Sequence, residues 1–88
     1  MNFLLRHKKT IKVQIKLLAG LDRLEGYDPQ KGIRIEVPEG TRLKYVLKTV
    51  PLPRDQPISY IVNGEKAKGN TRLKDGDEIF CFLPFAGG

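Results

Sequence analysis

The chain's first regular pattern is a strict alternation of apolar and polar residues. Its apolar positions are Ile11, Val13, Ile15 and Leu17. A period of two is typical of a β-strand with one buried face, so we expect a strand over residues 10–17. The same alternation returns over residues 33–37 and ends at Pro38, which has no backbone N–H to donate. We expect these two strands to pair as a hairpin.

The segment between the two strands, residues 18–32, shows no period. It contains three glycines and Pro29. Because glycine and proline interrupt regular structure, the composition predicts a connection with at most one helical turn, around residues 21–25.

A helical period follows the turn at residues 38–40. The apolar positions are Leu43, Val46, Leu47 and Val50. This i, i+3, i+4, i+7 spacing predicts an amphipathic helix with one buried stripe. The Thr41 hydroxyl stands where it could cap the helix, and Pro51, followed by Pro53, is expected to end it. The outward face would carry Arg42, Lys44 and Lys48.

The remaining residues predict short strands joined by tight turns. Residues 58–62 form a largely apolar run, and the Asn63-Gly64 pair after it suits the positive φ angles of a type I′ hairpin turn. A short strand at 65–68 would return from that turn, and the last strand covers 78–83. Between them Leu73 is expected to enter the core, while Asp75-Gly76 makes a turn. The fold class is therefore α+β, with one mixed sheet of four or five strands packed on a single amphipathic helix.

The last strand is apolar at nearly every position, so its two faces must be assigned. We place Ile79, Cys81 and Leu83 toward the core, because the opposite choice would leave all three in water. Phe80 and Phe82 then face outward and are expected to form an apolar docking patch for a partner. An alternative with nearly equal support is that the N-terminal arm covers both aromatic rings.

Composition indicates one small domain. The chain has 88 residues, of which 40% are hydrophobic and 30% charged, and its longest apolar run is far below the roughly 20 residues needed to span a membrane. The basic residues near the N-terminus follow the apolar ones, the reverse of the order in a secretory signal. We expect a flexible basic arm at 1–9, a folded domain at 10–83, a flexible tail at 84–88, and a cytoplasmic location.

Charge and candidate chemistry add little to this picture. The formal net charge of +6 could serve nucleic-acid binding, but solvated basic residues on the arm and first strand explain it better. The single cysteine, Cys81, is read as a core residue, and together with His7 it cannot build a structural zinc site. Turn chemistry accounts for Asp75 and Asp77. No metal and no bound cofactor are expected.

Several motifs together resemble a known family. They cover the chain from about residue 10 to its end and occur in a fixed order: 37–41 (Val-Pro-Glu-Gly-Thr), 62–64 (Val-Asn-Gly), Thr71, Leu73, 75–78 (Asp-Gly-Asp-Glu) and 84–88 (Pro-Phe-Ala-Gly-Gly). In this order, and with the terminal diglycine, the chain resembles the ubiquitin-like β-grasp sulfur carriers, which include the molybdopterin synthase small subunit and the thiamine sulfur carrier ThiS.

The resemblance implies a carrier protein and not an enzyme. An activating enzyme would use ATP to adenylate the Gly88 carboxylate, and a sulfur donor would convert it to a thiocarboxylate. A synthase large subunit or a thiazole synthase would then take the sulfur, with molybdopterin or tungstopterin assembly favoured over thiamine. The tail residues that would enter the partner's active site are Pro84, Phe85, Ala86 and Gly87.

Two other functions stay open at this stage. The chain could be a protein modifier that is conjugated to lysines through Gly88. It could also be a non-covalent binding module on the same fold. No membrane partner is expected, and nucleic acid is not favoured.

Overall fold

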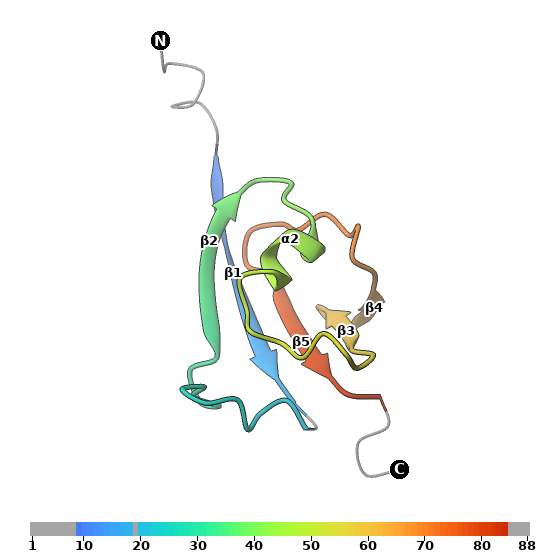
Figure 1. The fold of residues 1–88 in the computed structure, drawn as a ribbon. Coiled ribbons are helices and arrows are strands. Elements are labelled where there is room, and N and C mark those ends of the chain that lie inside the picture. The colour runs from blue at the N-terminus through green and yellow to red at the C-terminus, as the bar shows by residue number, and fades with distance from the viewer. Residues whose placement is uncertain (1–8, 19, 85–88) are drawn as a thin grey trace.

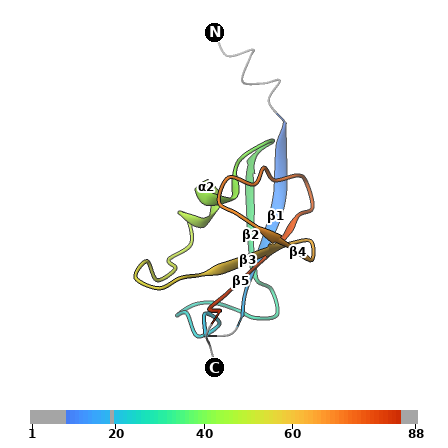
Figure 2. The same ribbon diagram turned by 90° about the vertical axis from the view of Figure 1, so that its right-hand side faces the viewer.

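A computed structural model describes residues 9–18 and 20–84 of the chain. In these residues a five-stranded mixed sheet curves around one short helix (Figures 1 and 2). The elements in chain order are β1 (Thr10–Leu17), β2 (Ile33–Pro38), α2 (Leu43–Leu47), β3 (Ser59–Val62), β4 (Glu65–Ala67) and β5 (Glu78–Phe82). The strand order across the sheet is β2-β1-β5-β3-β4. The α+β architecture predicted from the sequence is confirmed.

The two alternating segments form the predicted antiparallel pair. Thr10 lies opposite Pro38 and Ile15 opposite Ile33, so the inward residues of β1 and β2 share one face. On its other side β1 pairs with β5 in parallel, with Leu17 opposite Cys81. The C-terminal strand therefore lies in the middle of the sheet, between β1 and the antiparallel β3.

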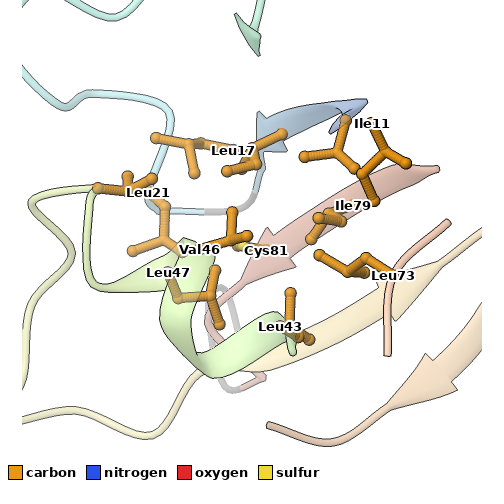
Figure 3. Close-up of a cluster of buried hydrophobic side chains, with 12 residues drawn as sticks. Ile11, Leu17, Leu21, Leu43, Val46, Leu47, Leu73, Ile79 and Cys81 are labelled. Carbon is orange, nitrogen blue, oxygen red and sulfur yellow. The ribbon is translucent and has the colours of Figure 1, made fainter. Parts of the chain in front are cut away.

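The core lies between the inner face of the sheet and α2 (Figure 3). Its fully buried side chains come from β1, from α2 and the turn after it, and from β5 and the segment before it: Ile15, Leu17, Leu43, Leu73, Ile79, Val46, Val50 and Cys81. These include Ile15 and Leu17 of the first alternating strand and most of the predicted helical stripe, whereas the inward residues of β2 are only partly buried. Leu73 is only 1% exposed, which confirms that it enters the core.

The helix is shorter than the apolar spacing predicts. It begins at Leu43 and ends at Leu47, and Val50 is buried from a turn that follows it. The Thr41 hydroxyl does not cap it but donates to the Pro38 carbonyl at 2.6 Å, so that prediction is wrong. The N–H groups of Leu43 and Lys44 instead donate to the carbonyls of Thr71 and Gly69. Neighbouring backbone thus replaces a side-chain cap.

The end of the helix also has a physical cause. Thr49 and Val50 donate to carbonyls three residues back, and not four, so the last turn is tighter than an α-helix. Pro51 disfavours the α conformation for the residue before it and has no N–H of its own. Pro51 thus ends the helix before its own position in the chain. The tightened turn between them still buries Val50.

The connection at residues 18–32 holds no helical turn at 21–25. It is a series of turns in which Leu21, Leu24 and Tyr27 each donate to a carbonyl three residues earlier. The Tyr27 hydroxyl accepts the N–H of Leu17 at 2.8 Å and so ties the connection to the end of β1. A Cβ on Gly32 would lie 2.8 Å from the Ile15 carbonyl oxygen, so this position requires glycine.

The turn between β3 and β4 has the predicted geometry and an additional anchor. Asn63 and Gly64 have φ angles of 51° and 86°, as a type I′ turn requires. The Asn63 amide donates to Asp77 Oδ1 at 2.7 Å, and its Oδ1 accepts the Glu78 N–H at 2.9 Å. Asp77, only 7% exposed, also accepts the Lys74 N–H through Oδ2. One buried carboxylate therefore joins this turn to the start of β5.

Replacing Asn63 should reveal how much this anchor contributes. In Asn63→Gly the φ angle stays unstrained, but Asp77 Oδ1 loses its amide donor, so we expect the free energy of unfolding to fall by about 1–3 kcal/mol. Asn63→Ala should lower the free energy of unfolding by about 1 kcal/mol more, because alanine is strained at a positive φ angle. Urea denaturation measures both changes. An Asn63→Gly variant as stable as the wild type would contradict the anchoring role.

Candidate functional site

The chain leaves the sheet at the end of β5, beside the end of β1. On the β1 side the last ladder contact is the Leu18 N–H, which donates to the Cys81 carbonyl at 2.8 Å, and on the β3 side Phe82 still lies opposite Ser59. Pro84 follows in an exposed turn and is the last described residue. The predicted tail residues Phe85, Ala86, Gly87 and Gly88 lie outside the described residues. The structure thus places the base of the tail, at the end of a strand that has neighbours on both sides.

The two faces of β5 are divided as the sequence predicts. Ile79 and Cys81 are completely buried on the helix side. Leu83 is only partly buried, although it packs against the same core. Phe80 and Phe82 are half-buried, and by strand alternation they lie on the outer face of the sheet. The core assignment is confirmed for Ile79 and Cys81 and holds in part for Leu83.

The outer face also carries an apolar residue of β3 that the sequence analysis missed. Ile61 of β3 lies directly opposite Phe80, and Ser59 lies opposite Phe82. We call Ile61, Phe80 and Phe82 the outer-face patch. Lys16, the β1 partner of Phe80, and Lys66, the β4 partner of Ile61, flank it. The signal was available, because Tyr60 and Val62 pack against the core and Ile61 between them must point away.

Whether the N-terminal arm covers the outer-face patch stays a prediction. Residues 1–8 lie outside the described part of the chain, and with them His7. The described geometry does fix where the arm starts. Because β1 and β5 are parallel and Leu17 lies opposite Cys81, Lys9 is at the other end of β1 from Phe82. An arm that covered the patch would have to run back along the sheet.

The chemistry of Cys81 follows from its burial. Loss of solvation raises the pKa of this thiol to about 12, so it stays protonated at neutral pH. Burial also raises the pKa of Tyr60, with Cys81 opposite it as a smaller cause. The thiolate is the nucleophilic form of cysteine, and the structure disfavours it here. Cys81 is therefore a core residue, as predicted.

Among residues 9–18 and 20–84, no group of three or more His, Cys, Asp or Glu side chains is placed to hold a metal ion. In the same residues, no helix has the length and apolar content to cross a membrane.

A known protein family matches most of this chain. Residues 15–88 match the ThiS family, from the middle of β1 to the terminal diglycine. The chain belongs to the ThiS family. It is thus a ubiquitin-like sulfur carrier with the β-grasp fold, as its motifs predicted. A search of curated proteins finds no match to this ThiS-family chain.

Solved structures share the fold of this ThiS-family protein. A Pyrococcus furiosus protein described as molybdopterin converting factor, subunit 1, is 26% identical, with a TM-score of 0.68 over 84% of this chain and 98% of the other. The Haloferax volcanii HVO 2177 protein is 23% identical, with a TM-score of 0.66 over 90% and 88%. SAMP1 from Haloferax volcanii is also 23% identical, with a TM-score of 0.64 over 88% and 99%.

Membership of this family indicates the general role of the site. The family consists of small carrier subunits that generally do no catalysis themselves, and its members act with an activating enzyme and a synthase subunit. What the fold does supply is a fixed point of departure for the tail and an apolar patch next to it.

Proposed function

We propose that this ThiS-family protein carries sulfur as a thiocarboxylate on Gly88. The single observation that supports this most is that the family match runs to residue 88 and includes the Gly87-Gly88 pair. The position of β5 supports it as well, because a strand held on both sides keeps the base of the tail in a defined place. The reactive group is then a main-chain carboxylate.

The chemistry requires activation before sulfur can be added. At neutral pH the Gly88 carboxylate is an anion and a poor electrophile. One of its oxygens attacks the α-phosphorus of ATP in the activating enzyme, which releases pyrophosphate and leaves an acyl adenylate. A sulfide equivalent from the sulfur donor then attacks the acyl carbon, and AMP leaves with the bonding electrons. The product is the thiocarboxylate, and the carrier contributes only its acyl group.

The tail residues suit delivery into a narrow active site. Gly87 and Gly88 have no side chains, so the last part of the tail can pass where a larger residue would collide. Pro84, at the exit from β5, restricts the backbone there. Phe85 and Ala86 would occupy the partner's channel, and the outer-face patch would rest on the partner's surface. Aromatic side chains of this kind often dominate binding energy in protein interfaces.

The sulfur acceptor is proposed to be a precursor of molybdopterin or tungstopterin, with the thiamine pathway second. The likeness to the Pyrococcus furiosus protein, at 26% identity, supports the first pathway. The partner would then be a synthase large subunit, and for thiamine it would be a thiazole synthase. We propose a cytoplasmic location for this function, because the activating enzyme would need ATP.

The test is intact-mass spectrometry after incubation with the activating enzyme, ATP and a sulfur donor. We expect the mass increase for one oxygen replaced by sulfur, and tandem fragmentation should locate the change at Gly88. Omitting ATP is the control and should leave the mass unchanged. An unchanged mass in the complete reaction would contradict the proposal. Gly-Gly remnants on lysines of other proteins, without any thiocarboxylate, would favour a protein modifier instead.

A further inference from the structure

Strand β2 forms one edge of the sheet. It pairs with β1 on one side, and among the described residues no strand pairs with its other side (Figure 1). Its six residues, Ile33–Pro38, are long enough to accept a further strand. The unpaired N–H and C=O groups of such an edge are a template for another strand, although charged residues and proline, which β2 also contains, limit which strands can pair.

The hydrogen bonds of β1 show which backbone groups of β2 face the open edge. The Lys12 N–H donates to Asp75 Oδ1 at 2.8 Å, and its carbonyl accepts the Gly76 N–H at 2.8 Å. Both groups thus point away from β2. In an antiparallel ladder, when one residue points its N–H and C=O away from the partner strand, the residue opposite it also points its N–H and C=O away, toward the other side of the pair. Glu36, opposite Lys12, therefore points its N–H and C=O at the open edge.

Arg34, two residues before Glu36 in β2, has the same orientation. The Gln14 N–H donates to the Asp77 carbonyl at 3.0 Å, so Arg34, opposite Gln14, also points its backbone groups outward. Near the ends of β2, the edge has no further N–H group that could donate to another strand. Gly32 already donates its N–H to the Asp28 carbonyl, and Pro38 has none. The available donors are those of Arg34 and Glu36.

A second copy of the same strand matches this edge in one register. In an antiparallel pair, residues with outward backbone groups must lie opposite one another, which leaves three registers for Arg34 and Glu36. Two of them place Arg34 opposite Arg34 or Glu36 opposite Glu36, and like charges directly opposite are unfavourable. The third puts Ile35 on a two-fold axis and places Arg34 of each copy opposite Glu36 of the other.

The side chains also fit this register. Arg34 and Glu36 are exposed on the outer face, where oppositely charged neighbours attract. The inward residues Ile33, Ile35 and Val37 are only half-buried at this edge, and Ile35 would gain cover from Ile35 of the second copy. Ile35 and its copy would form a non-hydrogen-bonded pair, the kind of antiparallel pair in which the side chains approach most closely.

We propose that β2 is a self-association edge, on which a second copy of this chain pairs antiparallel with Arg34 opposite Glu36. Each Arg34–Glu36 pair exchanges both of its N–H···O bonds, and the two sheets become continuous. Because the edge is short, the dimer is weak and reversible. The outer-face patch and the exit of the tail lie beyond β1 from this edge, so they stay accessible in the dimer.

Charge reversal tests the edge and its register. Sedimentation equilibrium of the full chain at low ionic strength should show a mass that rises with concentration from 10.0 kDa toward twice that value. Arg34→Glu and Glu36→Arg each create two like-charged pairs and should weaken association at least tenfold, as an order of magnitude. An equimolar mixture of the two variants should associate again, because the unlike copies restore both opposite-charge pairs.

Arg54→Glu is the matched control. It changes the net charge as Arg34→Glu does, from an exposed loop residue outside the edge, and should leave association unchanged. A wild type that stays monomeric at millimolar concentration would overturn the proposal. So would a mixture that fails to recover, or an Arg54→Glu variant that weakens association as much as Arg34→Glu.

Discussion

Removal of Gly88 is expected to abolish thiocarboxylate formation. The shortened chain still ends in a carboxylate, on Gly87, but this carboxylate lies one residue closer to β5. The described geometry gives the tail no slack at its base, because the Leu18–Cys81 hydrogen bond and both neighbouring strands hold β5 in place. A one-residue loss therefore withdraws the acyl carbon from the site of adenylation by about 3.3–3.6 Å. Reaction requires near-contact distances, so turnover should be undetectable by intact-mass spectrometry.

A Gly88→Val variant separates the effect of tail length from the effect of side-chain size. It keeps the length of the tail but adds a branched side chain next to the reacting carbon, so we expect its loading to be lost as well. The control is a deletion at the other end of the chain, of residues 1–8, which precede the first strand and should leave loading intact. Full loading of the chain without Gly88 would show that the terminal carboxylate is not the sulfur site.

The second large effect is expected at the outer-face patch. Phe80→Ala should weaken binding to the activating enzyme and the synthase by about 30-fold or more, the effect of losing a central aromatic residue that contributes about 2 kcal/mol or more to an interface. The ring lies on the outer face between Lys16 and Ile61, and not in the core, so the fold should persist. Titration calorimetry measures the affinity, and circular dichroism checks the fold.

The matched control for Phe80→Ala is Tyr45→Ala. Tyr45 is 50% exposed, on α2 at the other face of the sheet, and the Lys44 and Lys48 ammonium groups each lie 5.3 Å from its ring. Its removal should leave both affinities unchanged. If Phe80→Ala binds normally, or if Tyr45→Ala is the weaker binder, docking does not use the outer-face patch.

Strands and turns were predictable from the sequence because their signals are local. The alternation from Ile11 to Leu17 gives the bounds of β1 correctly, and Asn63-Gly64 gives a type I′ turn with positive φ at both residues. The helix was not predictable at its ends. Its first N–H groups find acceptors on Gly69 and Thr71, far along the chain, and no spacing near Thr41 indicates that.

The candidate site was predictable in part. The burial of Cys81 and the outward position of Phe80 follow from alternation once the core side of β5 is known. Ile61 was missed because it stands between the apolar Tyr60 and Val62, and Ser59 alone marks the outer face of β3 as the more polar one. The register, which places Ile61 opposite Phe80, confirms its outward position. The reach of the tail depends on residues beyond Pro84, which the described structure does not include.

The parallel pairing of β1 and β5 has a mechanical consequence. The chain enters β1 at one end of the sheet and leaves β5 at the other, and Gln14 to Leu17 lie opposite Glu78 to Cys81. Tension between the two chain ends would thus act along the strands and load the hydrogen bonds between them together. Bonds at the end of a hairpin would instead open one after another. A partner that pulls on the tail would strain the tail before it separated the sheet.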